Sequence, residues 1–234
     1  MRPLHSFLPL ILFAMILFTS CASNEIGDSK DVAQDKIYQS YFINYTEGNA
    51  SAAVECQFRF AGRNGTTLVL NSPSQVTLDG EILKVDSSKG GGAMYPAQKG
   101  ATGFFGKHNF AFTTTDNKTY TNSFSFSPFK LVNLPSSASK AQPLNINFET
   151  EALQSDDYIE LETTNSDSSF TVRHTSADAG NAILIPAKLL KKQTGKQLSL
   201  QATIYRSPAL QQTTNEGGRM EMKYELKPVT IVLN

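Results

Sequence analysis

The sequence predicts an all-β fold, built as two tandem antiparallel β-sandwiches. From Ile37 onward, apolar and polar residues alternate with a period of two in short runs, and turn residues separate these runs. Strands with one apolar face each must bury that face, and antiparallel sandwiches do so while leaving the other face in water. Helical patterning is confined to 186–195, which opens on proline, carries lysines and ends on glycine.

Residues 37–134 supply the strands of the first expected sandwich. Within 54–60, apolar Val, Cys and Phe residues alternate with Glu, Gln and Arg, which is typical of a half-buried strand. Residues 110–126 form a second run of this kind, with phenylalanines on one face and an Asp-Asn turn in the middle. Both segments are therefore expected to contribute one face to a core.

A hairpin is expected over 74–85. Asp79 and Gly80 tolerate the positive φ angles that a tight type I′ turn requires at both central positions. This turn places Leu78 opposite Glu81 and so fixes the pairing register of the two strands.

Residues 135–143 are Ser-rich and lie between prolines, which is typical of a linker. Residues 144–234 then repeat the alternation and are expected to form the second sandwich. The architecture is immunoglobulin-like, without the Cys–Trp–Cys core of antibody domains, because the chain has no Trp. One long sandwich is the alternative, in which 135–143 becomes a surface loop.

The N-terminus has the pattern of a secretory signal. Residues 1–20 hold one arginine, an apolar run too short to span a bilayer and a small-residue end. Leu17 to Cys21 resembles the lipobox of bacterial lipoproteins, in which the leader is removed and the cysteine is lipidated on sulfur. Cleavage just after Ala22 is the alternative and would leave no anchor. Residues 21–36 are polar and predict a flexible tether.

The chain also resembles envelope lipoproteins of Bacteroidota, in the segment from Phe110 to Leu134 and in the ending GGRMEMKYELKPVTIVL. The resemblance implies a modular ectodomain anchored by lipid, at the periplasmic face of the outer membrane or at the cell surface. It transfers no catalytic residue.

Charge and cysteine content argue against nucleic-acid binding and against a catalytic thiol. The 21 basic and 21 acidic side chains balance, so the chain has no electrostatic attraction for nucleic acid. Cys56 is the only cysteine besides Cys21, and its place on the apolar side of a strand predicts a small buried hydrophobe.

The catalytic patterns that we considered are weak, and we expect no enzyme and no cofactor. His108 and His174 lack metal-ligand spacing and a nucleophile motif. Glu160 and Glu162 lie two apart on one strand, about 6.5–7 Å from each other, but alternate glutamates are typical of a solvated face. The glycine-rich segment 100–107 departs from the phosphate-binding loop pattern.

No metal site is expected. Four aspartates in predicted loops could in principle gather around calcium, but they lack the spacing of calcium loops, and turn formation explains them equally well. They are Asp156, Asp157, Asp167 and Asp178.

The segment 89–107 is the richest candidate for ligand binding. It combines three consecutive glycines with Tyr95, Phe104 and Phe105, and a mobile loop that presents these rings could stack on a glycan or a peptide. Alternatively, the rings cap the sandwich. The expected function is a non-catalytic binding or structural module of the envelope, anchored to the membrane and contacting an envelope protein or glycan.

Overall fold

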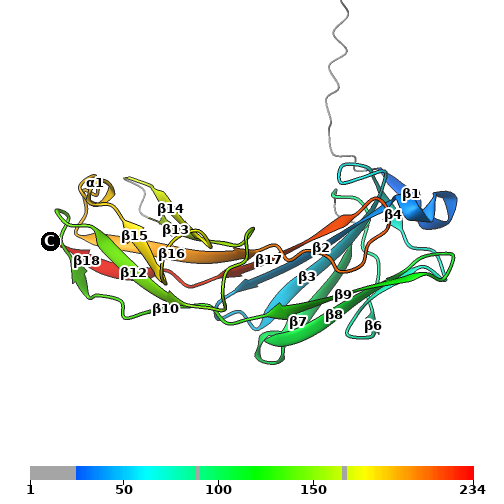
Figure 1. Ribbon diagram of the computed structural model, residues 1–234, viewed down its shortest axis with the longest axis horizontal. Helices are drawn as coiled ribbons and strands as arrows, with labels where there is room; N and C mark the ends of the chain where they lie inside the picture. Colours follow the sequence, from blue (N-terminus) through cyan, green and yellow to red (C-terminus); the bar gives the residue numbers. More distant parts are fainter. Residues whose placement is uncertain (1–24, 88–89, 165–167) are drawn as a thin grey trace, which may run out of the picture.

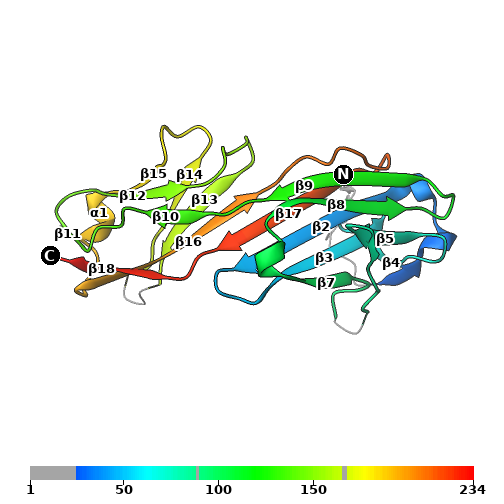
Figure 2. The same ribbon diagram turned by 90° about the horizontal axis from the view of Figure 1, so that it is seen from below.

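The computed structural model describes residues 25–87, 90–164 and 168–234. They form an elongated molecule in which one long sheet runs from end to end and two smaller sheets pack against one of its faces (Figures 1 and 2). The predicted all-β sandwich architecture is confirmed. The described chain starts near β1 at one end, and the C-terminal strand β18 lies at the other.

The long sheet contains most of the strands. In spatial order its main path is β1 (Ile26–Asp28), β4 (Thr66–Val69), β3 (Ser51–Phe60), β2 (Ile37–Thr46), β17 (Gly218–Glu225), β16 (Gln197–Arg206), β13 (Tyr158–Thr163) and β14 (Thr171–Thr175). Three further strands join it, β7 (Tyr95–Gly100) beside β3, β18 (Val229–Leu233) beside β16, and β11 (Ser137–Ala138) beside β18.

Each half of the long sheet is covered by one smaller sheet. The first consists of β6 (Glu81–Ile82), β5 (Gln75–Leu78), β8 (Gly106–Thr113) and β9 (Thr119–Phe126), and the second of β10 (Lys130–Val132), β12 (Leu144–Glu149) and β15 (Ala182–Ile185). The helical pieces are η1 (Ser29–Asp31), η2 (Gln34–Lys36), η3 (Ala101–Gly103) and α1 (Ala187–Leu190). The helix expected over 186–195 is therefore present, capped by Pro186, but it is a single turn.

Strand β17 pairs with a different half of the molecule from the one expected. The sequence division placed it in the second sandwich, yet it pairs in parallel with β2 along its whole length. Strand β16 pairs with β18 over 197–200 and with β17 over 203–206, so the two C-terminal strands lie end to end beside it. Pro228, between them, has no N–H to continue a ladder. The two sandwiches thus share one hydrogen-bonded sheet. The expected boundary also differs, because residues 130–132 already pair with β12 of the second half and residues 137–138, within the expected linker 135–143, pair with β18 as β11.

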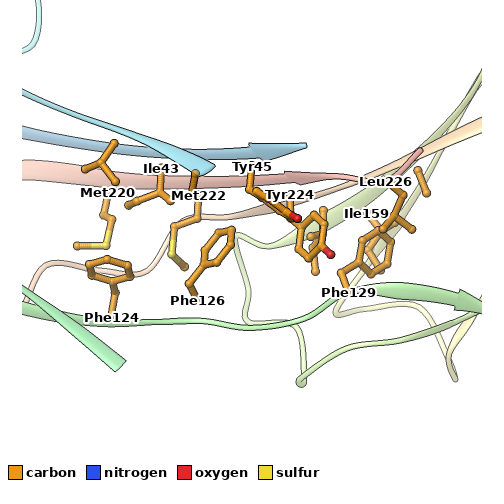
Figure 3. Close-up of a cluster of buried hydrophobic side chains, with 14 of the residues drawn as sticks. Ile43, Tyr45, Phe124, Phe126, Phe129, Ile159, Met220, Met222, Tyr224 and Leu226 are labelled. Atoms are coloured by element: carbon orange, nitrogen blue, oxygen red, sulfur yellow. The ribbon is translucent and has the colours of Figure 1, made fainter. Parts of the chain in front are cut away.

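The hydrophobic core is continuous across the junction of the two sandwiches. Figure 3 shows Met220 and Met222 of β17 facing Phe124 and Phe126 of β9. Tyr224 then contacts Tyr45 at a ring-centroid distance of 4.9 Å. Further along, Phe129 and Leu226 are buried in the same cluster, which extends to Ile159 of the second half.

The predicted hairpin at Asp79–Gly80 is confirmed. Both residues have positive φ angles, 53° and 83°, and Leu78 lies opposite Glu81. The phenylalanine-lined hairpin is also present as β8 and β9, whose rings point into the core.

The loop 209–217 covers the free edge of β9. In the first smaller sheet, β9 is terminal, and its outward N–H groups would be left without strand partners. The Gln212 side-chain oxygen accepts from the N–H of Thr121 at 2.8 Å, and the Gln211 oxygen accepts from that of Ser123 at 2.6 Å. The Gln211 amide also donates to the Ser123 carbonyl oxygen. The two glutamines thereby substitute for a neighbouring strand.

Replacing both Gln211 and Gln212 with alanine is expected to speed the hydrogen exchange of the Thr121 and Ser123 amides. The free energy of unfolding should fall by about 1 kcal/mol, because each such bond contributes little net stability. Exchange measured by NMR tests this, with the Ala111 amide in β8 as an internal control. Unchanged exchange at Thr121 and Ser123 would contradict the role assigned to the loop.

Candidate functional site

Tyr95 is a core residue. It stands opposite Cys56 in the pairing of β7 with β3, is 3% exposed and lies edge-on to Phe58. Its hydroxyl accepts from the Leu70 N–H at 2.6 Å and donates to the Leu68 carbonyl oxygen at 3.3 Å. The donor and the acceptor of the Tyr95 hydroxyl group are therefore both used within the protein, and the side chain presents no polar group to a ligand.

Phe104 is also buried, at 3% exposure, and stacks on His108 at a centroid distance of 4.3 Å. Phe105 is 37% exposed and lies against Tyr45. The expected three-ring stacking surface is therefore not formed. The reason is the pairing of β7, which turns Tyr95 into the sandwich, while the η3 turn delivers Phe104 to the core.

The glycine-rich segment lies against the sheet. Gln57 donates to the carbonyl oxygens of Gly91 and Ala93, and the Ala93 N–H donates to the Thr67 hydroxyl. Gly92 has φ +87°, and a Cβ there would overlap the Thr67 side chain. Residues 91–93 are thus anchored, in contrast to the mobile loop that was expected, and Lys89 lies outside the described residues.

Alkaline pH is expected to destabilise the protein, because burial raises the pKa of Tyr95 to about 12 from its ordinary value of 10.0. Between these values the unfolded chain releases the proton that the folded chain retains, so the free energy of unfolding falls as pH rises. Burial raises the pKa of Tyr41 and of the Cys56 thiol in the same direction. Melting temperatures from about pH 8 to about pH 11 should fall less steeply for Tyr95→Phe, and an identical slope would contradict this assignment.

The two histidines lie in the interior. The His108 Nδ1 is 2.8 Å from an Asp79 carboxylate oxygen and its Nε2 is 2.8 Å from the Phe104 carbonyl oxygen, so both ring nitrogens are engaged. His174 is 5% exposed and packs edge-on against Phe148, in agreement with the core position expected for it. Cys56 is fully buried, which confirms its assignment as a small hydrophobe.

Three of the carboxylates named as catalytic or calcium-binding alternatives have other partners. Asp157 pairs with Arg206 at 2.8 Å, Asp178 accepts from the Thr175 N–H and hydroxyl, and Glu160 pairs with Arg173 at 2.8 Å. Hydrogen bonds from Thr175 lower the pKa of Asp178. Within the described ranges, no three His, Cys, Asp or Glu side chains gather as metal ligands, and Asp167 lies outside those ranges.

The best-formed candidate site lies on the face of the long sheet that no smaller sheet covers. Ile159, Ile204 and Ile43 point into the core, so their neighbours point outward. The pairing registers align these neighbours in one row across the strands. In order, the row is Tyr158, Tyr205, Lys223, Asn44, Ala53 and Gln98.

Two depressions follow this row. One, of about 280 Å³, is lined by Tyr158, Tyr205, Lys223 and their neighbours, and the other, of about 400 Å³, lies over β2, β3 and β7. Phe42 and Asn44 line both. Together the depressions form what we call the cross-strand groove.

A column of stacked side chains borders the groove. Tyr158 and Tyr205 stack at 4.7 Å with an interplanar angle of 20°, and the Arg173 guanidinium lies 4.5 Å from the centre of the Tyr158 ring. Both faces of Tyr158 are thus occupied, and Tyr205 ends the column on the side of Lys223. Burial raises the pKa of Tyr205, and Lys223 opposes that rise.

Two ion pairs of β17 lie beside the groove. Lys223 contacts Glu225 at 2.6 Å and Arg219 contacts Glu221 at 2.5 Å. A hydrogen bond from Lys223 to Glu225 raises the pKa of Lys223. The lining therefore offers aromatic surface, amide and hydroxyl groups, with little net charge.

This site was not among the sequence-based candidates. Alternate residues facing away from the core are normally solvated, as the sequence predicts for Glu160 and Glu162. The available signal was the aromatic type of Phe42, Tyr158 and Tyr205 at positions where the alternation predicts polar residues.

No protein-family model and no curated protein matches the chain. Murine CEACAM1b is similar over 84% of this chain and 100% of that chain, with a TM-score of 0.26 and 8% identity. SGBP-B of the Bacteroides ovatus mixed-linkage glucan utilization locus, solved with a mixed-linkage heptasaccharide, is similar over 90% of this chain and 67% of that chain, with a TM-score of 0.21 and 11% identity. Both TM-scores are too low to place this chain in the fold family of either protein.

Proposed function

We propose that this protein is a lipid-anchored bacterial envelope lipoprotein that acts as a non-catalytic binding module. The observation that carries the binding role is the cross-strand groove, which is lined by the half-buried rings of Phe42, Tyr158 and Tyr205 on a face that no smaller sheet covers. Aromatic rings beside convergent polar groups are typical of binding sites.

The anchor rests on the lipobox pattern at Cys21, which lies outside the described residues together with the signal segment 1–20. None of the helices in the described chain has the length and apolar character needed to cross a membrane. A lipidated Cys21 supplies that attachment instead, since acyl chains hold a protein at a bilayer surface. The flexible tether expected over 21–36 is corrected for its second half, because residues 26–36 form β1, η1 and η2 and are held against the long sheet, at the end of the molecule opposite the C-terminus.

A binding role fits the groove better than an enzymatic one. Of the two carboxylates that line the depressions, Glu221 is paired with Arg219 and Glu55 also interacts with a neighbouring group, and neither His108 nor His174 lines either depression. A general acid or base needs a free proton-carrying group at the reacting atoms. We therefore retain a protein or glycan of the envelope as the partner, and place its site at the groove in place of the rings of Tyr95, Phe104 and Phe105.

The anchor is tested by expressing the full chain with Cys21→Ser in a bacterium that processes lipoproteins. We expect the wild type in the membrane fraction with a lipid-modified N-terminus by mass spectrometry, and the variant without lipid. An unmodified Cys21 in the wild type would refute the anchor.

The binding role is tested by co-sedimentation of the detergent-solubilised mature protein with envelope fragments from a strain that lacks it. The double variant Asn44→Ala/Tyr205→Ala should lose co-sedimentation. Tyr38→Ala is the matched control, because Tyr38 lies on the same face of β2 but lines neither depression. Equal binding by all three proteins would refute the groove as the site.

A further inference from the structure

We infer that the ligand of the cross-strand groove is a linear, uncharged glycan that lies across the strands. This inference rests on the proposed binding function and specifies its substrate class. Three features of the groove support it, namely its lining, its rings and its length.

The lining provides hydrogen-bonding groups without net charge. Within the described residues, the Asn44 amide and the Tyr205 and Ser207 hydroxyls have no hydrogen-bond partner, and all three line the first depression. Amides and hydroxyls both donate and accept, as sugar hydroxyls do. Because Lys223 and Arg219 are neutralised by Glu225 and Glu221, a polyanion gains little there.

The rings provide the apolar part of the site. A sugar ring has a face of C–H groups that packs on an aromatic side chain, and Tyr205 ends the Arg173–Tyr158–Tyr205 column on the groove side. Arg219 lies over Phe42 with its guanidinium carbon 4.7 Å from the ring centre. Rings held in this way lose little conformational freedom on binding.

The length of the groove favours a chain over a small molecule. The row from Tyr158 to Gln98 crosses five strand spacings, which is about 24 Å. A peptide is the less favoured occupant, because extended peptides gain affinity by pairing with an unpaired strand edge. The groove lies on the face of a sheet whose strands β16, β17, β2 and β3 are already paired on both sides.

The test uses envelope fragments as the binding target for the mature protein. Fragments digested with protease should retain binding within about twofold of the undigested ones. Polysaccharide released from the fragments is then separated by anion exchange, and the uncharged fraction should compete for binding while the acidic fraction should not.

The same uncharged fraction separates specific from incidental binding. Tyr205→Ala should weaken its binding about tenfold, Asn44→Asp should also weaken it, and the Tyr38→Ala control should remain within about twofold. Asn44 is exposed, so its substitution leaves the fold intact.

Loss of binding after protease digestion, competition by the acidic fraction alone, or equal binding by Tyr205→Ala and wild type would each overturn the glycan assignment. In the first two cases co-sedimentation with undigested fragments still supports the binding function. Absence of co-sedimentation altogether would instead refute the proposed function.

Discussion

Replacing Asp157 with alanine is expected to lower the free energy of unfolding by about 3–5 kcal/mol. The Asp157 side chain is 3% exposed and that of Arg206 is 12% exposed, so the variant leaves a buried cation without its counter-charge. Asp157 also accepts from the N–H groups of Gln154 and Ser207. Arg206 in turn donates to Thr150 and to the carbonyl oxygen of Glu151, so that one ion pair holds the whole loop between β12 and β13.

The matched control is Glu160→Ala, which breaks the pair with Arg173. Arg173 is 60% exposed, and exposed pairs contribute less than about 1 kcal/mol. Urea denaturation of both variants measures the difference. A loss below 1 kcal/mol for Asp157→Ala would show that the loop is held by other contacts.

Replacing Phe58 with alanine is expected to cost about 3–5 kcal/mol, because it opens a cavity that the surrounding structure fills only in part. Phe58 is fully buried, stacks on Phe112 at 4.4 Å and meets Tyr41 and Tyr95 edge-on. The residue therefore joins β3 of the long sheet to β8 of the first smaller sheet.

Phe105→Ala is the control for this second prediction. Its ring is 37% exposed, so truncation removes less buried surface and should cost about 1 kcal/mol. Thermal and urea unfolding compare the two variants. Equal losses would mean that Phe105 contributes to the core as much as Phe58 does, contrary to its exposure.

The segment 89–107 shows the limit of what can be predicted from neighbouring residues alone. Its glycines and aromatics are compatible both with an exposed stacking loop and with a cap on the sandwich, and nothing in the neighbouring residues separates the two. The pairing of β7 with β3 determines that Tyr95 is part of the core and not of an exposed loop, because this pairing sets the face of the sheet to which Tyr95 points. A shift of one residue in that register would have reversed the outcome.

The cross-strand groove could not be predicted from the sequence of any single strand. Tyr158, Tyr205, Lys223 and Asn44 come from four strands, and each alone is an ordinary outward residue of a half-buried strand. They line one groove, the candidate site, only because the registers place them in one row. Alternation reveals which face a residue occupies but not which strand lies beside it.

By itself, the sequence determined the all-β class, the turn at Asp79–Gly80 and the burial of Cys56, because alternation and turn chemistry act over a few neighbouring residues. Only the tertiary structure decided that β17 joins β2, that two glutamines cover the edge of β9 and that the groove proposed for binding forms on the long sheet. These features depend on contacts between segments far apart in the chain, and local patterns do not encode the identity of such partners.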